Sequence, residues 1–157
     1  MKKILKSLAA ASLILVFMLP ADAQAQLRQQ VTKNFGIGAM FGEPTGVTVK
    51  VWSGNNVAFD VGGAWSLASS DQDLHLHASM LFHSWFNDRP NVAFYYGIGG
   101  RILFADDSKI GVRIPFGLTY VMGRLPLDLF VEVAPILDLV PDTGFAGNGA
   151  VGARIYF

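Results

Sequence analysis

Gly149-Ala150-Val151-Gly152-Ala153-Arg154-Ile155-Tyr156-Phe157 is the stretch that decides the fold, because apolar residues alternate with small or polar ones up to a final aromatic residue. In an extended strand, neighbouring side chains point to opposite faces. One face therefore carries Val151, Ala153, Ile155 and Phe157, and the other carries Ala150, Gly152, Arg154 and Tyr156. A strand with one oily face and an edge at the end of the chain must hide that edge by pairing.

The same two-residue period recurs in seven earlier segments, which are separated by turn-forming residues. The predicted strands span residues 34–42, 45–53, 57–67, 74–86, 92–104, 109–122 and 127–139. The predicted turns and loops are Glu43-Pro44 and residues 53–56, 68–73, 87–91, 105–108, 123–126 and 140–148. With the terminal strand the count is eight, and the short connections predict an antiparallel up-and-down arrangement.

Side-chain volume decides which face of these strands points outward. An eight-stranded barrel has an interior only just wide enough for its own side chains. The oily face carries several bulky residues from nearly every strand, whereas the other face is rich in glycine and alanine. The sequence therefore predicts an all-β, eight-stranded antiparallel transmembrane β-barrel with its oily face toward lipid.

The inward face also carries charges of both signs. They are Lys50, Arg101, Arg113 and Arg154 against Asp60, Asp128, Glu132 and Asp138, together with the lumen histidines His75, His77 and His83. Because buried charges must be paired, we expect a salt-bridged lumen that does not conduct.

Matching the faces of each hairpin fixes the expected neighbours in that lumen. Pairing Val51 with Phe59 places Lys50 beside Asp60 as its ion-pair partner. The other hairpins bring His77 near Arg101, set Gly117 opposite Glu132 and Gly111 opposite Asp138, and let Arg154 approach Glu132 and Asp138.

The first 23 residues predict a cleaved secretory signal peptide, with basic residues, an apolar core from Leu8 to Leu19 and a small-residue cleavage site. Residues 24–33 are a polar lead-in, and residues 34–157 form the barrel domain. Removing Lys2, Lys3, Lys6 and Asp22 with the leader leaves nine basic and eleven acidic residues. This balance gives no sign of nucleic-acid binding, and the absence of cysteine excludes disulfides.

The pattern over residues 34–157 resembles the small eight-stranded bacterial outer-membrane barrels, the OmpA-like transmembrane domains. The resemblance implies a bacterial outer-membrane location, contact with outer-membrane lipid and folding by the barrel-assembly machinery. It also implies that Tyr156 and Phe157, at the end of the terminal strand, act as the assembly signal.

Two chemical alternatives come from the histidines. His75 and His77 lie on one face and could share a metal ion with Asp73 or Asp138 as a third ligand, although lumen histidines bound to carboxylates are commoner, so no metal is predicted. Ser79 and His83 share the lumen face but lie about 13 Å apart at ~3.3 Å per residue, beyond hydrogen-bond reach. Ser69, Ser70 and His75 remain candidates near the outer rim.

The leading hypothesis is thus a non-enzymatic outer-membrane barrel with a structural or interaction role and no cofactor. A lipid-modifying enzyme, either an acyltransferase or a deacylase, and a narrow solute pore are the alternatives.

Overall fold

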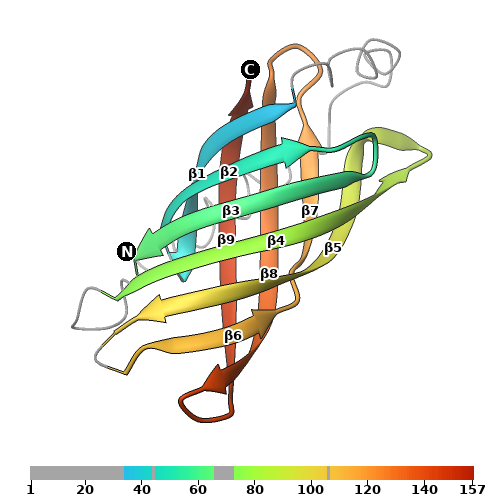
Figure 1. The fold of residues 1–157 in the computed structure, drawn as a ribbon. Coiled ribbons are helices and arrows are strands. Elements are labelled where there is room, and N and C mark those ends of the chain that lie inside the picture. Colours follow the sequence, from blue (N-terminus) through green and yellow to red (C-terminus); the bar gives the residue numbers. More distant parts are fainter. Residues whose placement is uncertain (1–33, 44, 66–72, 106) are drawn as a thin grey trace, which may run out of the picture.

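The computed structural model describes residues 34–43, 45–65, 73–105 and 107–157. The predicted signal peptide, the lead-in, Ser69 and Ser70 lie outside the described residues. The described part is built from nine strands (Figure 1). They are β1 (Phe35–Glu43), β2 (Thr45–Trp52), β3 (Val57–Trp65), β4 (Leu74–Phe86), β5 (Arg89–Phe104), β6 (Lys109–Arg113), β7 (Phe116–Val121), β8 (Leu127–Val140) and β9 (Gly144–Tyr156). Among these residues there is no helix of the length and apolar character that a membrane crossing requires.

The described strands pair antiparallel in one closed ring of eight positions. From β1 to β5, each strand pairs with the next strand in the sequence. In addition, β8 pairs with β9, and β9 pairs with β1. Both β6 and β7 pair with β5 on one side and β8 on the other, so they occupy a single position. The predicted eight-stranded up-and-down barrel is therefore confirmed.

The predicted single strand over residues 109–122 is interrupted at Ile114 and Pro115. Proline has no N–H to donate to the ladder, which is the physical reason for the break. The two residues nevertheless stay in the wall, because Gly97 N–H donates to the Pro115 carbonyl at 2.9 Å and Ile114 N–H donates to the Pro135 carbonyl at 3.0 Å.

The terminal strand closes the barrel against the first strand. Gly36 pairs with Tyr156 and Gly38 with Arg154, and the Phe157 N–H donates to the Phe35 carbonyl at 2.8 Å. At Gly38 the backbone of β9 passes so close that an added Cβ would overlap the Ala153 carbonyl. Glycine at this position permits the close approach.

The strands are strongly staggered around the ring. Successive partners lead from Gly36 through Lys50, Asp60, Ser79, Gly99, Arg113 and Ile136 to Ala146. Ala146 lies ten residues before Tyr156, the direct partner of Gly36. This offset of ten residues is the shear of the barrel, and Figure 1 shows the slanted strands that accompany it.

The predicted registers of the hairpins are confirmed. Four pairs were expected from face matching, and all are observed: Lys50 with Asp60, His77 with Arg101, Gly117 with Glu132, and Gly111 with Asp138. Because the registers hold, the assigned faces also hold, with the oily residues on the exposed side and the charged residues buried.

Two predicted connections are shorter in the structure than expected. The expected turn over residues 87–91 is confined to Asn87 and Asp88, since β5 already begins at Arg89 after a register shift beside Phe86. The expected loop over residues 140–148 shrinks to residues 141–143, because β9 begins at Gly144. Glycine and alanine dilute the hydrophobic period there, while the backbone still pairs fully with β8.

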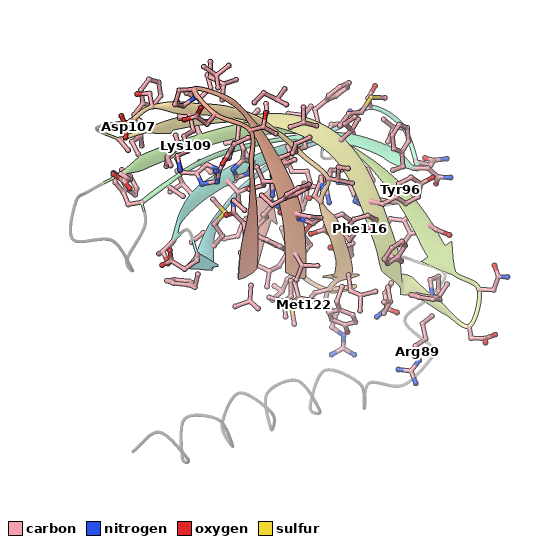
Figure 2. The ribbon with its side chains drawn as sticks, turned by 90° about the horizontal axis from the view of Figure 1, so that it is seen from below. Arg89, Tyr96, Asp107, Lys109, Phe116 and Met122 are labelled. Carbon is pink, nitrogen blue, oxygen red and sulfur yellow. The ribbon has the colours of Figure 1, made fainter. Side chains whose placement is uncertain are left out.

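The outer wall is an apolar belt, which we define as the outward-facing side chains of the barrel. Exposed large residues occur on every position of the ring, among them Ile37, Val61, Ile98, Val133 and Val151. Figure 2 shows two of the belt's aromatic residues, Tyr96 of β5 and Phe116 of β7, which are cross-strand partners. Near Tyr96, the rings of Phe82 and Phe94 lie 5.7 and 6.3 Å away, so aromatic residues gather on this side of the wall.

Candidate functional site

The barrel encloses every charged residue and histidine that the sequence analysis placed in the lumen. Each is at most 8% exposed: Lys50, Asp60, His75, His77, His83, Arg101, Arg113, Asp128, Glu132, Asp138 and Arg154. They come from β2, β3, β4, β5, β6, β8 and β9, so almost the whole ring contributes. We call these residues the lumen network.

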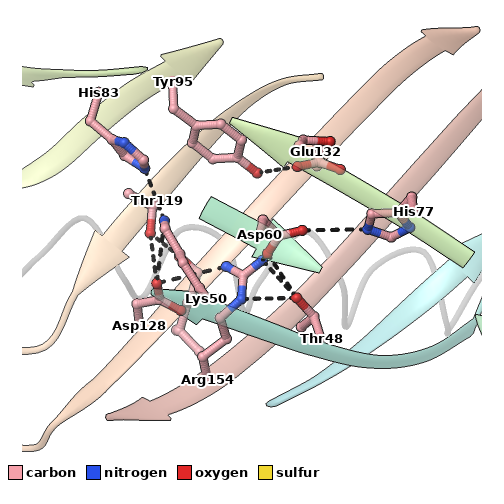
Figure 3. A network of polar contacts seen from close by, with 12 residues as sticks. Thr48, Lys50, Asp60, His77, His83, Tyr95, Thr119, Asp128, Glu132 and Arg154 are labelled. Atoms are coloured by element: carbon pink, nitrogen blue, oxygen red, sulfur yellow. Dashed lines mark hydrogen bonds and ion pairs between the residues drawn. The ribbon is translucent and has the colours of Figure 1, made fainter. Parts of the chain in front are cut away.

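Asp60 is the acceptor at the centre of the lumen network (Figure 3). Its carboxylate accepts from Arg154 Nη2 at 2.8 Å and from Thr48 Oγ1 at 2.9 Å. His77 Nε2 lies 3.4 Å from the other carboxylate oxygen. Arg154 Nε and Nη2 also donate to Thr48 Oγ1, both at 3.2 Å. The ion pair therefore joins β3 to β9 across the lumen.

Lys50 does not pair with Asp60, although the two residues are direct cross-strand partners as predicted. The Lys50 Nζ atom donates to His83 Nε2 at 2.9 Å and lies 3.9 Å from Asp128 Oδ2. Sequence register fixes only which backbones are adjacent. A long side chain in a narrow lumen reaches the opposite wall, and the shorter Asp60 side chain is already occupied by Arg154.

Asp128 is a second acceptor, near the end of the barrel where β9 finishes. Its Oδ2 accepts from Tyr156 Oη at 2.8 Å and from Thr119 Oγ1 at 3.4 Å. Arg154 Nη1 lies 3.8 Å from the same oxygen. The expectation that Arg154 approaches Glu132 and Asp138 is therefore wrong, because the guanidinium points toward Asp60 and Asp128 instead.

Glu132 and Arg113 form a separate pair halfway along the lumen. Arg113 Nη2 donates to Glu132 Oε1 at 2.5 Å, and Tyr95 Oη donates to Glu132 Oε2 at 3.0 Å. Arg113 Nη1 also donates to Ser79 Oγ at 3.3 Å. These contacts link β4, β5, β6 and β8.

Arg101 and Asp138 form the third group, toward the opposite end of the barrel. The pairing is bidentate, with Arg101 Nε and Nη2 donating to Oδ1 at 3.0 and 2.8 Å and Nη2 donating to Oδ2 at 2.7 Å. Both side chains are 6% exposed. Planar two-point pairing of this kind fixes the geometry more strongly than a single contact does.

His75 and His77 lie together but do not converge on a shared ligand position with a carboxylate. Their ring centroids are 5.7 Å apart and nearly perpendicular. His77 faces Asp60, whereas His75 Nε2 lies 3.5 Å from Asn148 Nδ2. Asp138 is engaged by Arg101. Within the described residues, no group of three or more possible metal ligands is found.

Ser79 and His83 are engaged by different partners. Ser79 Oγ accepts from Arg113, and His83 Nε2 accepts from Lys50. A hydrolytic serine needs a base that can take its proton directly. The arrangement observed for Ser79 and His83 therefore does not form such a pair.

Aromatic rings surround the cations, a feature that the sequence analysis did not assign. Lys50 Nζ lies 4.6 Å from the ring centroid of Trp52 and 5.4 Å from that of Tyr95. The Arg154 guanidinium carbon lies 3.8 Å from the Phe130 centroid. These contacts stabilise the cations through the ring faces. The sequence does contain a sign of these contacts, because Trp52, Tyr95 and Phe130 are bulky aromatic residues at inward-facing positions.

Comparison with solved structures shows the fold. The N-terminal β-barrel domain of Pseudomonas aeruginosa OprF matches with a TM-score of 0.65 and 12% identity, covering 80% of this chain and 98% of that domain. Neisserial surface protein A matches with a TM-score of 0.52 and 14% identity, covering 78% of this chain and 93% of that protein. No known family profile and no curated protein match the sequence.

The chain is thus a small eight-stranded β-barrel of the outer-membrane type. At these identities the likeness establishes the architecture alone, and any role must come from the chain's own surfaces and lumen.

Proposed function

We propose that this protein is an integral barrel of the bacterial outer membrane with a structural or interaction role. The closed ring with its apolar belt carries this proposal. Such a belt has no counterpart on a water-exposed surface, where exposed apolar patches are small. In lipid, the ring pairs the edges of all its strands, which an open sheet would leave unpaired. Export through the predicted signal peptide and folding by the barrel-assembly machinery complete the proposal.

The proposal includes a lumen that does not conduct. Arg154 and Arg101 each extend to a carboxylate on a strand that is not a direct neighbour in the ring, whereas Arg113 of β6 pairs with Glu132 of the adjacent strand β8. The bulky rings of Trp52, Tyr95, Phe130 and Tyr156 fill the same space and are buried. An interior filled by its own side chains is the expected state of an eight-stranded barrel.

The test is reconstitution of the protein in lipid vesicles, followed by two measurements. Heat-dependent gel migration and protease resistance should report a folded, inserted barrel. In planar bilayers we expect negligible steady conductance from the same preparation. Failure to insert into vesicles would refute the membrane assignment, whereas steady, ion-selective conductance would overturn the closed lumen and favour a narrow solute pore.

A comparison of lipid acyl chains with and without the protein addresses the enzymatic alternative. We expect identical acyl patterns for phospholipid and lipopolysaccharide. A changed acyl-chain pattern that disappears with His75→Ala would establish a lipid-modifying activity and would contradict a purely structural role.

A further inference from the structure

Lys50 and His83 are in contact near the end of the lumen where β9 finishes (Figure 3). Lys50 Nζ lies 2.9 Å from His83 Nε2, and the two residues are only 0% and 4% exposed. A lysine ammonium has three donors and no acceptor, so Nε2 accepts and the His83 ring is neutral. The one proton on the ring nitrogens is therefore on Nδ1, which is buried and has no hydrogen-bond partner among the described residues.

Three larger aromatic rings pack around this contact. The centroid of the His83 ring lies 4.4 Å from that of Trp52, 5.3 Å from that of Tyr95 and 6.4 Å from that of Trp85. Trp52 and Trp85 stack on each other, with their centroids 6.0 Å apart. Lys50 Nζ also lies over the rings of Trp52 and Tyr95. We call these five residues the end cluster, and its packing depends on where the His83 ring and the Lys50 ammonium lie.

The charged and titratable groups around His83 come from strands on all sides of the lumen. They are Lys50 of β2, Asp60 of β3, Tyr95 of β5, Asp128 of β8, and Arg154 and Tyr156 of β9.

Both carboxylates in this set are already engaged by other groups. Asp60 binds Arg154, and Asp128 Oδ2 accepts from Tyr156 Oη and lies 3.9 Å from Lys50 Nζ. Among the described residues, neither carboxylate forms a hydrogen bond or ion pair with His83. A positive charge on the His83 ring would therefore face the Lys50 ammonium without a carboxylate of its own.

A second proton on His83 is incompatible with the observed contact. It would turn Nε2 from an acceptor into a donor, and two cations would face each other across a 2.9 Å contact. A protonated ring must therefore turn away from Lys50 and reach water. An exposed imidazole takes up its proton near pH 6.5. Each pH unit below this value favours the released arrangement by up to about tenfold, because that arrangement binds one more proton.

We propose that Lys50 and His83 form a pH-sensitive latch, which holds the end cluster together at neutral pH and releases Trp52 and Trp85 to water in acid. The ion pairs of Arg154 with Asp60 and of Arg101 with Asp138 lie outside the end cluster, so the release is local and the barrel stays folded. The latch is a property of the folded barrel and goes beyond the membrane role proposed above.

Tryptophan fluorescence of the folded protein in detergent tests the latch. Trp52 and Trp85 belong to the end cluster, and the chain's third tryptophan, Trp65, lies on the apolar belt. Trp65→Phe is therefore introduced into every protein that is compared. We expect quenching by acrylamide to rise at least twofold between about pH 7.5 and about pH 5, on either side of the ordinary imidazole titration. Heat-dependent gel migration should be unchanged between the two conditions.

His83→Gln removes the titrating group. The glutamine amide oxygen accepts from Lys50 but takes up no proton in this range, so quenching should be equal at both pH values. Lys50→Met removes the opposing cation and should reduce the acid response at least twofold. His75→Gln is the matched control, because His75 is also a buried lumen histidine but contacts Asn148 in place of a cation. It should keep the full wild-type response.

Three results would overturn the latch. They are constant quenching in the wild type, an equal acid response in His83→Gln, and loss of heat-dependent migration in the wild type at the lower pH, which would mean that the whole barrel unfolds. Nitrogen NMR of the wild type with labelled histidine gives a test that needs no folded variant. It should place the His83 proton on Nδ1 at about pH 7.5, and a proton on Nε2 would contradict the contact with Lys50.

Discussion

The guanidinium of Arg154 on the last strand, β9, lies 2.8 Å from the carboxylate of Asp60 on β3, three positions away from β9 in the ring. Both side chains are 2% exposed. This contact does not join hydrogen-bonded neighbours. It ties the closing strand to β3 across the lumen.

Arg154→Met should strongly destabilise the barrel. Methionine keeps much of the side-chain length but leaves Asp60 without its guanidinium partner and takes a cation from beside Asp128. The expected loss is about 3–5 kcal/mol in the free energy of unfolding, measured by urea titration in lipid vesicles. Adding Asp60→Asn should recover part of this loss, because the stranded charge is removed. Strictly additive losses in the double variant would show that the two residues are not coupled.

Glu132→Ala should destabilise more than a change in an exposed turn. The substitution leaves Arg113 and the Tyr95 hydroxyl without the carboxylate that accepts from both. We expect a loss of about 3–5 kcal/mol against within about 0.5 kcal/mol for Asp142→Ala, which lies exposed between β8 and β9. Glu132→Gln should fall between them. Similar unfolding midpoints for Glu132→Ala and Asp142→Ala would argue against a stabilising lumen network.

Gly38→Ala should weaken closure of the barrel. The new methyl group overlaps the Ala153 carbonyl, so the β1–β9 seam must shift, at a cost of about 1–3 kcal/mol. Gly100→Ala is the control, because a Cβ there meets only the Gly111 carbonyl at 3.9 Å. The fraction of heat-modifiable protein should fall for Gly38→Ala alone, and equal fractions in both variants would contradict the steric argument.

Removing Phe157 should impair assembly more than stability. Its ring is 64% exposed, so packing in the folded barrel loses little, while one backbone hydrogen bond to Phe35 is lost. We expect reduced membrane yield in cells, with an unfolding free energy of refolded protein lowered by only about 0.5–1.5 kcal/mol. Phe157→Asp should act in the same direction, and Phe157→Tyr should preserve yield. Normal yield and heat-dependent migration in the deletion would exclude a signal role.

The architecture could be predicted from the sequence because three independent features, namely the alternation, the turn residues and the matching of faces, indicated the same fold. Alternation set the strands, turn residues set the hairpins, and matching oily faces set the registers, as the Lys50–Asp60 and Gly117–Glu132 pairs confirm. The first and last residues of the strands were harder to predict from the sequence. The Gly144–Asn148 half of β9 has little hydrophobic contrast, and its extended form is held by backbone pairing with β8, which composition does not report.

The pairing partners inside the lumen could not be read from register. Lys50 and Asp60 are backbone neighbours, yet each finds its closest charged or basic partner elsewhere, because side chains in a narrow barrel interact across the interior as readily as along the wall. Predicting Arg154 with Asp60 requires the stagger of the whole ring. The register of a single hairpin does not give the stagger summed around the ring.

Because the first and last strands pair, the folded barrel does not depend on which strand the chain begins with. Asn34 accepts from Trp52 N–H at 2.8 Å, and the next residue, Phe35, accepts from Phe157 N–H, so the two ends of the barrel segment lie side by side. A short peptide could join them, and the backbone could instead be opened at the turn between β4 and β5 without changing any neighbour in the ring. Such a circular permutant would keep the native contacts but place a different strand last. It would therefore separate the contacts that stabilise the folded barrel from the strand order that assembly in the cell requires.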